Sequence, residues 1–128
     1  MNSPLNNLAP LAVAASPDSS GALLARRGPA ATSRTVVTAD ARFRRSERLV
    51  VELPIRAPNV PVARLLDRAG TALTIPIAES DRDEADGSRW HTAEIALAPL
   101  APGDYLVEFA TGSGDSQKRS LVPFRVIR

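Results

Sequence analysis

The amino-acid sequence predicts an all-β protein in which two packed sheets, with about seven strands in all, form a sandwich. Three observations predict it. Aliphatic side chains recur at alternate positions after Ser33, turn-forming residues separate these stretches, and 11 prolines interrupt the chain too often for long helices. Alternation with a period of two places one set of side chains on a single face of each strand. The 128 residues suffice for one modest core.

The first 33 residues are predicted to form a disordered tail or linker. They are rich in Ala, Ser, Pro and Asn, and their prolines are spaced too closely for a stable helix. From Gly21 to Arg27 we expect at most one helical turn, because isolated helices of that length are marginal in water. The sandwich domain accordingly spans residues 34–128.

The first half of this domain is predicted to hold four strands. Thr35–Ala39 opens it, and Leu49–Ile55 follows with aliphatic residues at every second position. Val60–Asp67 and the alternating stretch Leu73–Ile77 should form a hairpin, because Asp67–Gly70 is a turn in which glycine can take a positive φ.

The second half is predicted to hold three strands after a surface loop. Residues 79–87 are polar and acidic without apolar periodicity, which indicates the loop. Strands are expected over Trp90–Leu97, Tyr105–Phe109 and Val122–Val126, with a Gly-rich turn at Thr111–Ser116 before the last one.

The segment Leu100–Tyr105 (LAPGDY) refines the fold class. In immunoglobulin-like sandwiches, a tyrosine at the start of the penultimate strand buries its ring and hydrogen-bonds upstream backbone. Tyr105 fits this structural role, and Pro102 and Gly103 supply a fixed and then a permissive φ for the preceding turn. Leu100 would close the end of the core. The prediction is therefore an immunoglobulin- or fibronectin-III-like sandwich.

Composition excludes several functional classes. The chain has no cysteine, so disulfides, thiolate metal sites and cysteine nucleophiles are impossible. A net charge of +2 from nearly balanced acids and bases does not indicate nucleic-acid binding. No apolar run approaches the ~18 residues that span a bilayer, so we expect no membrane insertion. The apolar stretch Leu8–Ala15 lacks a preceding basic residue and makes no convincing signal peptide.

No residues converge on a catalytic site, and the sequence predicts a protein that is not an enzyme and carries no cofactor. His91 is the one histidine. Nothing in the sequence places a nucleophile beside it, and it is expected at the sheet surface next to Trp90. The basic residues Arg42, Arg44, Arg45 and Arg48 are interpreted as guards of a solvated edge strand rather than as a nucleic-acid site.

Two features could bind a ligand. Asp81, Asp83 and Asp86, together with Glu84, offer the oxygen ligands that calcium prefers, although their spacing departs from that of known calcium loops. Trp90 could stack on a sugar ring. These are the weaker hypotheses, because Arg82 interrupts the acids and a glycan platform usually needs more than one exposed aromatic ring.

Three segments carry a resemblance to a known family: Arg42–Leu49 (RFRRSERL), Ala63–Gly70 (ARLLDRAG) and Leu100–Leu106 (LAPGDYL). Over residues 41–128 the chain resembles the C-terminal sandwich region of bacterial von Willebrand factor A-related proteins. Such proteins typically are exported and carry an upstream α/β domain with an Asp-x-Ser-x-Ser adhesion motif. Asp18–Ala22 lacks the second spacing of that motif, so its metal site is not carried over.

Two hypotheses for the function follow. The resemblance implies an accessory module, and we expect a non-enzymatic structural or interaction domain that contacts a neighbouring domain or another protein. The alternative is a recognition module that binds a glycan through Trp90 or calcium through the acidic segment 79–87. The resemblance also implies an extracytoplasmic location.

Overall fold

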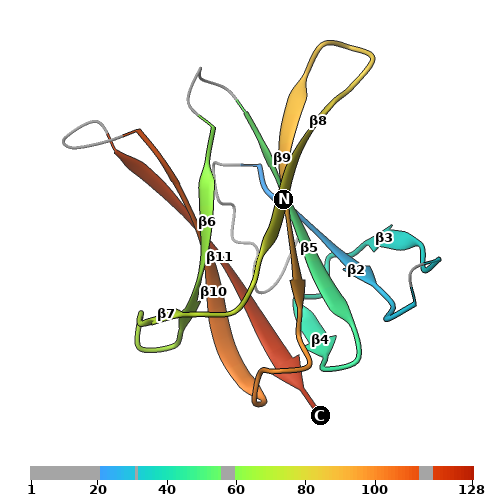
Figure 1. Ribbon diagram of the computed structural model, residues 1–128, viewed down its shortest axis with the longest axis vertical. Coiled ribbons are helices and arrows are strands. Elements are labelled where there is room, and N and C mark those ends of the chain that lie inside the picture. The colour runs from blue at the N-terminus through green and yellow to red at the C-terminus, as the bar shows by residue number, and fades with distance from the viewer. Residues whose placement is uncertain (1–20, 31, 56–59, 113–116) are drawn as a thin grey trace, which may run out of the picture.

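Two five-stranded sheets face each other in the computed structural model, which describes residues 21–30, 32–55, 60–112 and 117–128 (Figure 1). Sheet I has the order β4-β11-β10-β6-β7, and sheet II has the order β3-β2-β5-β9-β8. Neighbouring strands are antiparallel, except that β4 runs parallel to β11. The strands are β2 (Leu23–Arg27), β3 (Thr35–Val37), β4 (Arg42–Arg44), β5 (Arg48–Pro54), β6 (Val62–Asp67), β7 (Ala72–Leu73), β8 (Ala78–Asp83), β9 (Arg89–Ala96), β10 (Gly103–Thr111) and β11 (Lys118–Ile127).

All the described elements are strands and the core lies between their two sheets, which confirms the all-β prediction. Alternate residues of the central strands are buried, as Val107 and Phe109 of sheet I and Ala93 and Ile95 of sheet II illustrate. Such alternation is what a strand with one buried face requires. No helix occurs among the described residues, and so none there has the length and apolarity of a membrane crossing.

The described residues form more strands than the seven predicted, and two expectations were wrong. The acidic segment 79–87 is not a loop throughout, because β8 pairs along its length with β9 and only the residues after Asp83 turn. In place of the strand expected over Leu73–Ile77, β7 is only two residues long. Ile75 and Ile77 instead pack against the core while the chain crosses from sheet I to sheet II. Their alternation therefore reflects burial without strand pairing.

The expected start of the folded domain at residue 34 was also wrong, because residues 23–27 already belong to a sheet. The expected tail or helical turn is a strand, β2, which lies between β3 and β5 in sheet II. Leu24 packs against the core, whereas Leu23, its neighbour on the opposite face, is 39% exposed. The part of the predicted tail before residue 21 lies outside the described residues.

The turn before β10 has the predicted hydrogen bond. The Tyr105 hydroxyl donates to the carbonyl of Ala101 over 2.7 Å, and its ring stacks on Phe124. Gly103 begins β10 with a φ of 154°, a value that residues other than glycine rarely adopt. Pro102 is exposed in this turn, and Leu100 is buried and closes the core as expected. This end of the sandwich is thus fixed by a local contact.

The position of β2 predicts unequal effects for two neighbouring leucines. Leu24→Asp should lower the free energy of unfolding by about 2 kcal/mol, because it places a carboxylate against the apolar core. Leu23→Asp should cost less than about 1 kcal/mol, because that side chain already reaches solvent. Urea unfolding followed by tryptophan fluorescence measures both. Equal, negligible effects would show that this segment does not contribute to the fold.

Candidate functional site

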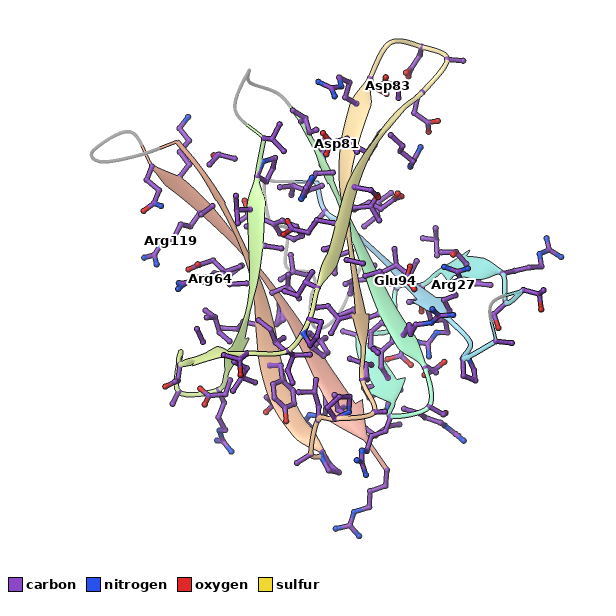
Figure 2. The ribbon with its side chains drawn as sticks, viewed as in Figure 1. Arg27, Arg64, Asp81, Asp83, Glu94 and Arg119 are labelled. Atoms are coloured by element: carbon purple, nitrogen blue, oxygen red, sulfur yellow. The ribbon has the colours of Figure 1, made fainter. Side chains whose placement is uncertain are left out.

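The acidic residues proposed as calcium ligands are held by other side chains. Asp81 contacts the His91 ring over 2.7 Å, and Asp83 pairs with Arg89 over 2.9 Å. Asp86 accepts hydrogen bonds from the backbone and hydroxyl of Ser88. Figure 2 shows Asp81 on β8 and Asp83 near the tip of the β8–β9 hairpin. Within the described part of the chain, no three carboxylate or imidazole groups form a metal-binding cluster.

His91 lies in the core and not at the sheet surface, which corrects the sequence-based expectation. It is 4% exposed, and its ring makes an edge-to-face contact with Phe109 of the opposite sheet. Its Nδ1 lies 2.7 Å from Asp81 Oδ1, and its Nε2 lies 2.7 Å from Glu79 Oε1. Both ring nitrogens therefore have a carboxylate partner, which is how a buried polar side chain is tolerated.

Glu79 connects the two sheets at their open side. Its Oε1 also accepts a hydrogen bond from the backbone N–H of Ala63 on β6, at 2.9 Å. Because β7 pairs only with Leu65 and Leu66, no strand formed by the described residues lies beyond this part of β6 on that side. The Glu79 carboxylate thus accepts from the Ala63 N–H, a backbone donor with which an added strand would otherwise pair. The polar cluster of Glu79, Asp81 and His91 is therefore explained by the structure of the sandwich.

Trp90 is half-buried and has one ring face occupied. The Arg82 guanidinium lies 5.6 Å from the ring centroid, and it also makes two hydrogen bonds to the Glu52 carboxylate. Thr92 donates a third hydrogen bond to Glu52. A cation over an indole ring is a stabilising contact in its own right. Sugar stacking by Trp90 is correspondingly restricted to the remaining surface of the ring.

The four arginines of the N-terminal basic cluster take different roles. Arg42 and Arg44 belong to β4, which is an edge strand of sheet I as the interpretation required. Arg42 pairs with Asp40, while Arg45 donates to the Ala98 carbonyl. Arg48 lies in sheet II, where it contacts backbone carbonyls and Glu94. The four side chains do not converge on one basic site.

A second charged cluster, on the outer face of sheet I, was not anticipated. Glu108 on β10 is 2% exposed, although it faces away from the core. Arg64 of β6 approaches its Oε1 to 2.7 Å, and Arg119 of β11 approaches its Oε2 to 3.0 Å. We call Arg64, Glu108 and Arg119 the sheet I triad. Figure 2 shows both arginines on the outer side of this sheet.

Exposed aliphatic side chains accompany this triad. The triad lines a pocket of about 390 Å³ together with Val62, Ala110 and two residues of the β10–β11 turn region. Val62 is 60% exposed, and Leu121, opposite Glu108 on β11, is 47% exposed. Large aliphatic residues that remain exposed on strands often mark an interaction surface. Val36 and Val37 on edge strand β3 are also exposed.

Comparison with known proteins gives no match to a family model, to a curated protein or to a solved structure. The fold is therefore assigned from the geometry as an all-β sandwich. The resemblance to von Willebrand factor A-related proteins stays a prediction.

The contacts of Glu79 predict a loss of stability that an exposed neighbour does not share. Glu79→Ala should lower the free energy of unfolding by about 2 kcal/mol, because the Ala63 N–H and the His91 ring each lose an acceptor. The control is Asp83→Ala on the same strand, where the side chain is 72% exposed. It should cost less than about 0.5 kcal/mol. Equal losses of stability for the two variants in urea unfolding would contradict the role of Glu79 in connecting the two sheets.

Glu52 predicts a pH dependence of stability. The hydrogen bond from Arg82 holds the pKa of the Glu52 carboxyl below its ordinary value of 4.5, and the Thr92 hydroxyl adds to this effect. The unfolded chain thus binds a proton at higher pH than the folded one, so stability is lost as the pH falls below about 4.5. Glu52→Gln should flatten this part of the curve of unfolding free energy against pH. An unchanged slope would contradict the linkage.

Proposed function

We propose that this protein is a non-enzymatic interaction module with an immunoglobulin-like sandwich. Strand order supports the immunoglobulin-like topology. Such domains place strands A-B-E-D in one sheet and G-F-C, with an added C′, in the other. In their order across the sheets, β2, β5, β9 and β8 correspond to the first set, and β11, β10, β6 and β7 correspond to the second. The Tyr105–Ala101 hydrogen bond lies at the start of the strand that corresponds to F.

The observation that carries the proposal is the group of aliphatic side chains left outside a complete core. Val62 and Leu121 occupy outward positions on strands whose inward positions already close the sandwich. Covering them would remove apolar surface from water, which favours association. The partner is another protein or a neighbouring domain. On the resemblance described above, the module would be an accessory domain of an exported von Willebrand factor A-related protein.

The contacts of the alternative sites favour neither calcium nor glycan binding. Asp81 and Asp83 already contact His91 and Arg89, and the Arg82 guanidinium covers one face of Trp90. A metal or a sugar would have to replace those contacts. The interaction surface, by contrast, needs no rearrangement of the sandwich.

Site-specific photo-crosslinking tests the proposed function. A photoreactive side chain introduced singly at positions 36, 62 and 121 reports on contacts of the exposed aliphatic groups, and position 85 in the β8–β9 turn is the control. In extracts of the source organism, at least one of the first three positions should give a discrete protein adduct that position 85 does not give. Identical patterns at all four positions, or adducts at none, would contradict an interaction role.

A further inference from the structure

We propose that the outer face of sheet I around the triad binds a protein segment that presents a carboxylate between aliphatic side chains. This inference rests on the proposed function and specifies the surface and the chemistry of its partner. The surface consists of Val62, Arg64, Glu108, Ala110, Arg119 and Leu121, and we call it the triad face.

Charge gives the first argument. Two guanidinium groups surround one carboxylate, so the pocket carries one positive charge in excess. Among the ion pairs of the described residues, Arg64 and Arg119 each have Glu108 as their acidic partner. Covering an unmatched charge with a neutral partner costs desolvation energy, whereas an incoming carboxylate compensates it. The planar guanidinium also matches a carboxylate in geometry, because it donates two parallel hydrogen bonds.

The exposure of the two arginines gives the second argument. The side chain of Arg64 is 54% exposed and that of Arg119 is 61% exposed, although the Glu108 side chain beneath them is almost completely buried. Glu108 therefore holds the guanidinium groups in position from below while their outer edges face solvent. Donors fixed in this way lose little conformational freedom when they bind a second acceptor.

A similar triad on sheet II shows what a purely structural arrangement looks like. There Glu94 pairs with Arg27 and Arg48, whose side chains are about half as exposed as those of the triad face. Arg27 also donates to the Ser33 carbonyl, and Arg48 donates to the Gly28 carbonyl. Figure 2 shows Arg27 and Glu94 close together on that sheet. The guanidinium groups of this second triad hold Gly28 and Ser33 between β2 and β3, whereas the side-chain contacts of Arg64 and Arg119 among the described residues go to Glu108.

Aliphatic neighbours argue for a protein partner and against a nucleic acid. Val62 lies opposite Ala110 and Leu121 lies opposite Glu108, so apolar side chains flank the buried carboxylate on both sides. None of the aromatic rings of the described residues belongs to this face, because those of sheet I point into the core or pack on it and Trp90 lies on sheet II. Without rings on which bases can stack, single strands would bind by charge alone.

Titration of the whole chain with defined probes, followed by amide chemical shifts in NMR, tests the inference. The first probe is a blocked peptide of about nine residues that alternates glutamate with valine. The second has lysine at every glutamate position, and the third is a thymidine oligonucleotide. The glutamate peptide should shift the amides of Arg64, Glu108, Ala110 and Arg119 and bind at least about tenfold more tightly than the lysine peptide.

Two variants and one matched control complete the test. Arg119→Gln should weaken binding of the glutamate peptide at least about fivefold, while Arg64 keeps Glu108 paired. Val62→Ser with Leu121→Ser should also weaken it, and the side chains changed in both variants are exposed. Arg34→Gln removes the same charge from an exposed position before β3 and should change the affinity less than about twofold.

Several results would overturn the inference. These are equal affinity for both peptides, tighter binding of the oligonucleotide, shifts confined to other faces, or no binding of the glutamate peptide. Each leaves the proposed function standing if the photo-crosslinking adducts form. Loss of those adducts would instead remove the proposed function itself, so the two failures are distinguishable.

Discussion

Two twisted sheets must close over one shared aliphatic core, and this constraint determines what every other part of the molecule can do. The central strands each give one face to that core, as the alternating burial of β9 and β11 shows. Function is therefore confined to outer faces, edges and turns. The same constraint explains why the buried polar residue His91 needs two carboxylates of the neighbouring edge strand, since a polar ring inside such a core must have partners.

Charged side chains in this protein divide into those that hold the fold and those that remain accessible. Arg26 belongs to the first group, because it contacts both oxygens of Glu47 and lies 4.8 Å over the Phe43 ring. The triad of sheet II likewise ties a loop to the sheet. The sheet I triad differs, because its carboxylate is buried and its guanidinium groups are not. Counting ion pairs would not separate the two groups, whereas exposure and second contacts do.

Local sequence signals predicted the two-sheet architecture and a hydrogen bond from Tyr105 to upstream backbone, because alternation and turn chemistry act within a few residues. They missed β2, since Arg26 occupies a core-facing register where the pattern calls for an aliphatic residue. They also missed β8, where Glu79 finds a partner on the opposite sheet and Asp81 finds one on the neighbouring strand. Arg64 lies 44 residues from Glu108 in the chain, so no local motif could indicate the triad face. Only the strand register brings these side chains together.

The edges of the sheets explain why recognition would use side chains and not backbone pairing. Edge strands β4 and β8 carry arginines and acids, and Glu79 occupies the donor at Ala63 where β6 has no outer neighbour. Strand addition is thereby hindered at these positions, and edge strand β3 is only three residues long. The triad face differs from these edges, because its exposed side chains combine charge with apolar surface. On the inference above, a partner of this face would be selected by the chemistry of its side chains, and its backbone need not be extended.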